Sequence, residues 1–152
     1  MTIGAPVEKV LEFIDDPENL AQCAPIVVRV AEAGRSSRHV GDSFRVTYRV
    51  LGVSLNEDFK VTGFEPPRRQ TPHRRFQIWQ TFYGRVRGTF AWTLEAEVNE
   101  TYASLDGAYQ LIGGVFGRAL DALLVERAIQ KHVDHMLENM KRQLEDQTIF
   151  TQ

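Results

Sequence analysis

The chain has 152 residues, with 18 Lys and Arg against 20 Asp and Glu, so its formal net charge is −2 at pH 7. This length fits one domain with one hydrophobic core, and the charge argues against a general nucleic-acid binder held by phosphate contacts. The N-terminus does not resemble a signal peptide, and no stretch approaches the roughly 20 apolar residues of a membrane span, so we expect a soluble cytoplasmic protein. Cys23 is the single cysteine, which excludes an intrachain disulfide and a zinc–cysteine cluster.

Two short helices are predicted near the N-terminus. Only Met1-Thr2-Ile3 precede them, so either the first strand is short or the numbered chain begins late. The first helix starts at Pro6 and ends at Asp15-Asp16-Pro17, and its apolar residues recur at helical spacing: Val7, Val10, Leu11 and Ile14. The second runs from Glu18 to Cys23 and is closed by Ala24-Pro25.

From Ile26 onward the apolar period changes to two, which is the pattern of β-strands. The predicted strands are Val27–Ala33, Ser43–Leu51, Ser54–Phe64, Arg75–Phe82, Arg85–Val98 and Thr101–Leu111. Most of the breaks between them are short and contain Gly, Pro or Asn. Short breaks favour consecutive antiparallel strands over parallel crossovers.

Alternation assigns one face of each predicted strand to the core. Arg45 and Arg49 mark the wet face of the strand Ser43–Leu51, so its other face points inward with Phe44, Val46, Tyr48 and Val50. The inward residues of the following strands are Val53, Leu55, Glu57, Phe59, Val61, Phe76, Ile78, Gln80, Val86, Phe90, Trp92, Leu94, Ala103, Leu105, Tyr109 and Leu111. A sheet that is apolar on one face needs a cover.

The last third of the chain predicts one long helix that can supply this cover. It opens after the turn Gly113–Gly117 and runs to about Glu145 without proline or further glycine. Its first half is apolar around nearly its whole circumference, which is usual for a helix that faces a cavity or is covered on all sides. Its second half narrows to one stripe, which we interpret as the anchor: Ile129, Val133, Met136, Met140 and Leu144, with Leu137 beside it.

Five polar side chains fall on predicted inward positions. A buried carboxylate must be paired or protonated, so Glu57 or Gln80 could orient a ligand or act as an acid or base. A bulge that turns both toward water is an equal alternative. Tyr48 and Tyr109 are interpreted first as core aromatics. Glu126 lies on the sheet side of the helical stripe, and a modest kink that exposes it is the preferred interpretation.

No metal or cofactor is expected. His132 and His135 are three apart on the predicted helix, but two ligands do not make a site, and their charged neighbours indicate a solvated face. Gly113-Gly114-x-x-Gly117 precedes a helix as a dinucleotide fingerprint does, yet no strand follows to complete the βαβ unit. No nucleophile–histidine–acid constellation is visible either, so catalytic residues are unassigned.

A proline- and arginine-rich loop from Pro66 to Arg75 stands apart in composition. A solvated loop is the first interpretation. Peripheral contact with an anionic membrane surface is the alternative, through Arg68, Arg69, Arg74 and Arg75. We expect no nucleic-acid partner, and the pattern leaves the oligomeric state open.

The order of several short motifs resembles one family. They are Ile3-Gly4-Ala5-Pro6-Val7-Glu8-Lys9-Val10, Phe13-Ile14-Asp15-Asp16-Pro17-Glu18-Asn19-Leu20, Val40-Gly41-Asp42, Phe64-Glu65-Pro66-Pro67-Arg68, Gly88-x-Phe90-x-Trp92-x-Leu94-Glu95, and the Gly-Gly turn into the helix up to Met140-Lys141. Together they resemble the START-like (SRPBCC) superfamily, and within it the polyketide cyclase/dehydrase and lipid-transport group, relatives of the coenzyme Q-binding proteins. The resemblance implies one START-like ligand-binding domain over residues 1–152. Its fold would be the α+β helix-grip fold, with a seven-stranded antiparallel sheet curved around a long C-terminal helix and two short helices after the first strand.

The resemblance also implies a cavity between sheet and helix that holds an apolar molecule. Our first hypothesis is therefore binding, sequestration or transport of a lipid, isoprenoid or polyketide-like molecule, without catalysis. The alternative is a polyketide aromatase/cyclase or dehydratase acting in the same cavity, and a further one is a non-enzymatic protein-interaction domain. The predicted ligand-binding residues are Phe44, Val46, Tyr48, Leu55, Glu57, Phe59, Phe76, Ile78, Gln80, Phe90, Trp92, Leu105, Tyr109, Leu120, Leu123, Leu124, Glu126, Ile129, Val133 and Met136.

Overall fold

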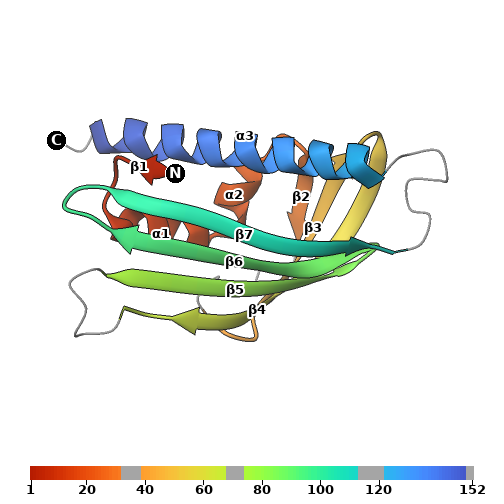
Figure 1. The fold of residues 1–152 in the computed structure, drawn as a ribbon, viewed down its shortest axis with the longest axis horizontal. Helices are drawn as coiled ribbons and strands as arrows, with labels where there is room; N and C mark the ends of the chain where they lie inside the picture. The colour runs from red at the N-terminus through yellow and green to blue at the C-terminus, as the bar shows by residue number, and fades with distance from the viewer. Residues whose placement is uncertain (32–38, 68–73, 113–121, 150–152) are drawn as a thin grey trace.

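The computed structural model describes residues 1–31, 39–67, 74–112 and 122–149. In these residues one long helix lies across a curved antiparallel sheet (Figure 1). The elements in chain order are β1 (Thr2–Ile3), α1 (Val7–Asp15), α2 (Pro17–Cys23), β2 (Val27–Ala31), β3 (Ser43–Val50), β4 (Val53–Glu65), β5 (Arg75–Gly84), β6 (Val86–Ala96), β7 (Thr101–Leu111) and α3 (Ala122–Ile149).

The sheet has seven strands in the order β1-β7-β6-β5-β4-β3-β2. Strands β2 to β7 therefore pair with their neighbours in the chain, and β1 closes the far edge by pairing Thr2 with Tyr102 of β7. Every pairing is antiparallel. The predicted seven-stranded antiparallel sheet is confirmed.

Two register shifts help to bend the sheet. One lies in β2 between Val27 and Arg29, and the other in β4 between Val61 and Gly63. An extra residue in one strand bends it and increases its local twist. In Figure 1, β2, β3 and the first part of β4 rise beside the N-terminal half of α3, whereas the later part of β4 and β5 lie farther from the helix.

The two short helices follow directly from local sequence. Asp16 accepts a hydrogen bond on Oδ1 from the backbone N–H of Glu18 (2.9 Å) and so caps α2, and Pro17 suits the first helical turn because it has no N–H to leave unpaired. The apolar stripe of α1 is buried as predicted: Val7, Val10, Leu11, Phe13 and Ile14.

Hydrogen bonds fasten the C-terminal half of α3 to the start of the chain. Asn139 Nδ2 donates to the Cys23 carbonyl (2.9 Å), Lys141 Nζ donates to the Thr2 carbonyl (2.9 Å), and Glu145 accepts from the Gly4 N–H (2.8 Å). The helix continues to Ile149, beyond the predicted end at Glu145. The predicted turn Gly113–Gly117 lies outside the described residues.

The interior divides into two parts along α3. At its C-terminal half, α1, β1 and the sheet enclose a packed core that includes Ile3, Val10, Ile14, Leu94, Met140 and Leu144. Near its N-terminal half the buried cluster is smaller, with Leu55, Phe82 and Val86 at its centre and the half-buried Tyr48, Val53, Phe59, Phe90, Tyr109 and Leu111 around it. Burial agrees with the inward strand assignments, including Glu57 and Gln80.

Candidate functional site

A cavity with two adjoining lobes lies between the sheet and α3. The first lobe has a volume of about 150 Å³ and the second about 140 Å³. The lobes share part of their lining: Ala24, Val27, Val46, Phe59, Phe90, Val133 and Met136. A closed apolar cavity of roughly 150 Å³ takes up one benzene molecule, so each lobe has room for about one ring.

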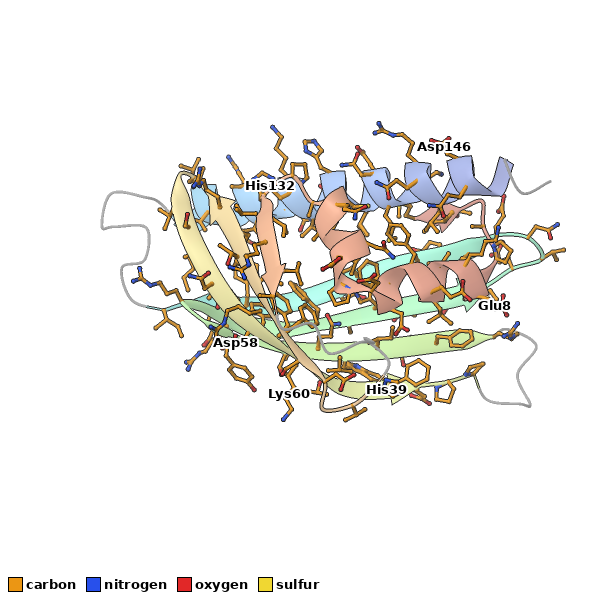
Figure 2. All side chains as sticks on the ribbon, turned by 180° about the vertical axis from the view of Figure 1, so that it is seen from behind. Glu8, His39, Asp58, Lys60, His132 and Asp146 are labelled. Atoms are coloured by element: carbon orange, nitrogen blue, oxygen red, sulfur yellow. The ribbon has the colours of Figure 1, made fainter. Side chains whose placement is uncertain are left out.

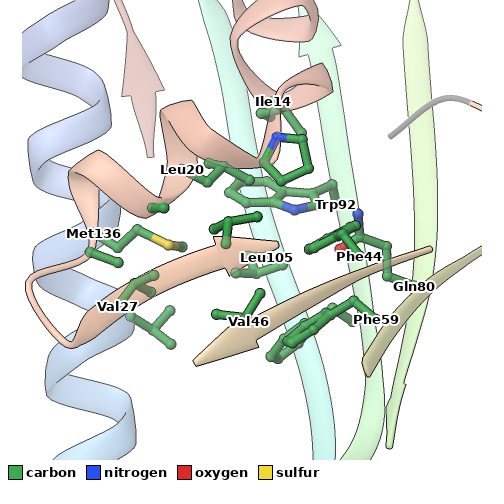
Figure 3. A pocket seen from close by; sticks show the side chains of 16 residues that line it. Ile14, Leu20, Val27, Phe44, Val46, Phe59, Gln80, Trp92, Leu105 and Met136 are labelled. Carbon is green, nitrogen blue, oxygen red and sulfur yellow. The ribbon is translucent and has the colours of Figure 1, made fainter. Parts of the chain in front are cut away.

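The first lobe is almost entirely apolar. Its remaining lining residues are Ile14, Pro17, Leu20, Ala21, Val30, Phe44, Gln80, Trp92 and Leu105. Figure 3 shows these side chains converging from α1, α2, α3 and the strands, with Met136 on the helix side and Gln80 beside Phe44. Gln80 and the indole of Trp92 supply its polar groups.

Four phenylalanines from four successive strands form a row along the cavity wall. Ring centroids are 5.3 Å apart for Phe44 and Phe59, 5.2 Å for Phe59 and Phe82, and 4.7 Å for Phe82 and Phe90, and each pair is stacked. Gly107 lies opposite Phe90 in β7, and a Cβ there would stand 2.6 Å from the Phe90 ring. The missing side chain therefore leaves the space that this ring occupies.

Glu57 is a fully buried carboxyl group behind the second lobe. Its Oε1 accepts a hydrogen bond from the Val86 N–H at 2.9 Å, whereas Oε2 has no hydrogen bond of ordinary geometry among the described residues. Burial raises the pKa of Glu57, and the N–H groups of Val86 and Arg85 together with Tyr48 oppose that rise. The buried carboxyl is thus held closer to its neutral form than an exposed glutamate.

The room for this carboxyl comes from a residue on the neighbouring strand. Gly84 of β5 pairs with Glu57 of β4, and a Cβ on Gly84 would overlap Glu57 Oε2. Glycine at this position is therefore part of how the fold accommodates the glutamate.

Tyr48 connects Glu57 to the cavity. It lines the second lobe, and it lies on the same face of the sheet as Glu57, because Tyr48 pairs with Leu55 and Val46 pairs with Glu57. Burial raises the pKa of Tyr48, and the nearby Glu57 carboxyl raises it further. The pair is a phenol at the cavity wall with a carboxyl group behind it.

Two further polar side chains line the second lobe, namely Tyr109 of β7 and His132 of α3. Burial raises the pKa of Tyr109, and the charge of Glu126 adds to the rise. Burial lowers the pKa of His132, with smaller contributions from His135 and Lys131. The imidazole therefore favours its neutral form, which has one donor and one acceptor nitrogen.

His132 corrects the prediction of a solvated histidine pair. His135 is exposed, but His132 is half-buried and borders the cavity. The physical reason is helical geometry, because His132 lies three residues after Ile129 and four before Met136, at the edge of the stripe that faces the sheet. This spacing was the signal that could have placed His132 beside the cavity. The sequence interpretation gave more weight to the charged neighbours, which indicated a solvated face. Figure 2 labels His132 on α3.

Many of the predicted ligand-binding residues line one or both lobes. They are Phe44, Val46, Tyr48, Phe59, Gln80, Phe90, Trp92, Leu105, Tyr109, Ile129, Val133 and Met136. The sequence interpretation omitted twelve lining residues, of which five belong to α2 and β2: Ile14, Pro17, Leu20, Ala21, Ala24, Ile26, Val27, Val30, Val50, Phe82, Val86 and His132. The short helix α2 therefore forms a wall that strand alternation did not indicate.

The other predicted residues lie elsewhere. Phe76 and Ile78 belong to the packed core, and Leu55 is buried in the cluster with Phe82 and Val86 and is not part of the lining. Leu123, Leu124 and Glu126 are exposed, because the helical stripe facing the sheet passes through Val125 and Ile129 instead. Leu120 lies outside the described residues.

The described arginines of the basic loop form ion pairs. Arg74 Nη1 lies 2.6 Å from Glu8 Oε1, and Arg75 Nε lies 3.7 Å from Glu95 Oε1. Arg68 and Arg69 lie outside the described residues. Acidic side chains thus neighbour both Arg74 and Arg75. A membrane contact at this loop stays a prediction.

The described residues include neither a metal-binding cluster nor a helix suited to crossing a membrane. Within residues 1–31, 39–67, 74–112 and 122–149, no three His, Cys, Asp or Glu side chains gather in a way that could hold a metal ion. In the same ranges, no helix combines the length and apolar character needed to cross a bilayer.

Solved structures share this architecture across nearly the whole chain. A START superfamily protein from Mycobacterium smegmatis matches with a TM-score of 0.69 and 14% identity, covering 96% of this chain and 94% of its own. A protein from Thermus thermophilus matches with a TM-score of 0.67 and 21% identity, covering 95% and 92%. These matches confirm the α+β helix-grip, START-like fold.

A third match is the di-domain ARO/CYC StfQ from the steffimycin biosynthetic pathway, with a TM-score of 0.60 and 19% identity. It covers 95% of this chain but 44% of StfQ, so the likeness concerns about one domain of that protein. No curated protein sequence matches the chain.

Residues 1–145 match the family described as "Polyketide cyclase / dehydrase and lipid transport". The chain belongs to this family, as the order of its sequence motifs predicted.

Proposed function

We propose that this protein binds and carries a hydrophobic small molecule in the two-lobed cavity. The observation that supports this role most directly is unfilled volume between the sheet and α3. It consists of two adjoining lobes of about 150 and 140 Å³ with predominantly apolar walls. Small-molecule sites are typically concave, mostly apolar and equipped with a few polar groups that orient the ligand. A domain acting through its outer surface alone would not need this internal volume.

Native mass spectrometry of the protein purified gently from its own host tests this function. We expect a population whose mass exceeds that of the chain by an extractable apolar molecule. Val133→Phe would introduce a larger side chain where the two lobes meet and should lose the added mass. Val98→Phe is the matched control, because Val98 is 95% exposed and outside the cavity lining. Recovery of the bare chain alone from the host would contradict the proposal.

A second candidate is a dehydratase or cyclase that uses the same cavity. The observation favouring it is the Tyr48 phenol at the second lobe with the buried Glu57 carboxyl behind it. General acid–base catalysis requires such groups in positions where protons are transferred. The pair could assist loss of a proton from carbon and of hydroxide from the neighbouring carbon, a net loss of water.

A small β-hydroxy ketone provides the assay. 3-Hydroxy-1-tetralone loses one water molecule to give 1-naphthol, which is fluorescent. An enzyme would form 1-naphthol faster than buffer does, and both Tyr48→Phe and Glu57→Gln would reduce kcat. A wild-type rate equal to that in buffer would count against this candidate while leaving carriage intact.

A further inference from the structure

Two buried polar atoms on the wall of the second lobe have no hydrogen-bond partner among the residues that the structure describes. They are Tyr109 Oη and His132 Nδ1. An unpaired buried polar atom costs free energy because it has given up its hydrogen bonds to water. Such atoms on a cavity wall are explained when an occupant supplies the missing partner.

The two residues line the same lobe from opposite sides of the fold. Tyr109 belongs to β7 in the sheet, and His132 belongs to α3, which covers it. Apart from Tyr48, the other residues that line this lobe are apolar: Ala24, Ile26, Val27, Val46, Val50, Phe59, Phe82, Val86, Phe90, Ile129, Val133 and Met136. A pure hydrocarbon in the lobe would leave Tyr109 and His132 unpaired.

We propose that the second lobe is a polar subsite that receives a hydroxyl or carbonyl oxygen of an otherwise apolar ligand, with Tyr109 Oη and His132 Nδ1 as its partners. This inference rests on the proposed function, since it requires a cavity that takes up small molecules. A tyrosine hydroxyl donates to either kind of oxygen, and the acceptor nitrogen of a neutral imidazole receives the proton of a hydroxyl. A hydroxylated ligand can therefore pair with both residues, and a ketone with Tyr109.

The apolar part of such a ligand meets an aromatic wall. Phe59, Phe82 and Phe90 border the same lobe, and their stacked rings offer a flat surface to another ring. A suitable probe is thus a flat hydrocarbon of two rings, one for each of the adjoining lobes, with one hydroxyl group. 1-Naphthol meets this description, and 1-methylnaphthalene has nearly the same shape without a polar group.

Binding of these two probes to the purified 152-residue chain, measured by isothermal titration calorimetry, tests the inference. We expect wild type to bind 1-naphthol more tightly than 1-methylnaphthalene by at least about fivefold, because one net hydrogen bond gives that ratio and a second adds to it. The double variant Tyr109→Phe/His132→Leu should lose this preference and bind 1-naphthol no more tightly than 1-methylnaphthalene, because the buried hydroxyl then has no partner, and each single variant should reduce the ratio. Tyr83→Phe and His39→Leu are matched controls, because both side chains are exposed, and they should keep the wild-type ratio.

The outcomes separate this inference from the function beneath it. If wild type binds both probes with equal affinity, or if the double variant keeps the preference, the polar subsite is refuted while the cavity still binds small molecules. If wild type binds neither probe and carries no apolar molecule from its host, the proposed function itself fails. Circular dichroism of each variant establishes that a lost preference comes from a folded protein.

Discussion

Met136 and Met140 lie one turn apart on α3, yet they belong to different kinds of interior. Met140 is fully buried in the packed core, whereas Met136 is half-buried and borders both lobes of the cavity. The difference comes from what lies beneath the helix. Residues of α1 and β1 pack against its C-terminal half, and the phenylalanine row faces open volume farther along. One helix thus stabilises the fold at one end and bounds a binding space at the other.

The difference between the two interiors predicts the largest loss of stability at Met140. Met140→Ala removes a side chain from a filled core, and we expect it to lower the free energy of unfolding by about 2–5 kcal/mol. Met136→Ala should cost clearly less, because its side chain already borders empty space. Urea denaturation of both variants measures the two changes, and equal losses would show that the two ends are packed alike.

Enlarging a side chain should likewise cost more stability in the packed core than beside the cavity. Val10→Phe in the packed core is expected to cost about 1–3 kcal/mol, since a filled interior cannot admit extra atoms without strain. Val133→Phe should cost less in stability and yet abolish uptake of 1-methylnaphthalene. Urea denaturation and calorimetry together check this, and retained uptake by Val133→Phe would mean that the probe occupies another place.

The buried Glu57 predicts that the stability of the folded protein depends on pH. Its pKa is raised above 4.5 in the folded protein, so above about pH 4.5 the folded state holds more protons than the unfolded state. The contribution of Glu57 to stability therefore falls as pH rises through the folded pKa. Glu57→Gln cannot titrate, so its stability relative to wild type should increase from pH 4.5 toward neutrality. Parallel stability curves for the two proteins would exclude this buried titration.

His132 predicts a smaller dependence of stability on pH, with the opposite sign. Its pKa is lowered below 6.5 in the folded protein, so near and below pH 6.5 the unfolded state binds more protons. Wild type should therefore lose stability relative to His132→Leu as pH falls through 6.5. Melting temperatures between about pH 5 and pH 8 measure the difference, and a constant difference across that range would contradict it.

The sheet could be predicted from sequence because alternation is a local property. Arg45 and Arg49 identified the wet face of β3, and the same rule placed Glu57 and Gln80 inside. The helical pattern of the last third predicted the covering helix, and the short breaks predicted consecutive strands. Family resemblance added the helix-grip arrangement with its seven strands. These features depend on residues near one another in the chain, or on motifs in a fixed order.

The division between packed core and cavity lining could not be read in this way. Phe76 and Phe44 both fall on inward positions of their strands. Only Phe44 borders a lobe, because α1 fills the space at one end of the sheet. The space around Glu57 likewise depends on Gly84, a residue of the neighbouring strand. Which inward side chains border empty volume is decided by three-dimensional placement of distant elements.

The position of Trp92 gives the protein an internal optical reporter. The chain has two tryptophans; Trp92 is 2% exposed and lines the first lobe, while Trp79 lies outside both lobe linings. A molecule that enters the first lobe must come into contact with the Trp92 indole and change its emission. In Trp79→Phe, where Trp92 is the single emitter, occupancy of the cavity could be followed by fluorescence without any attached label.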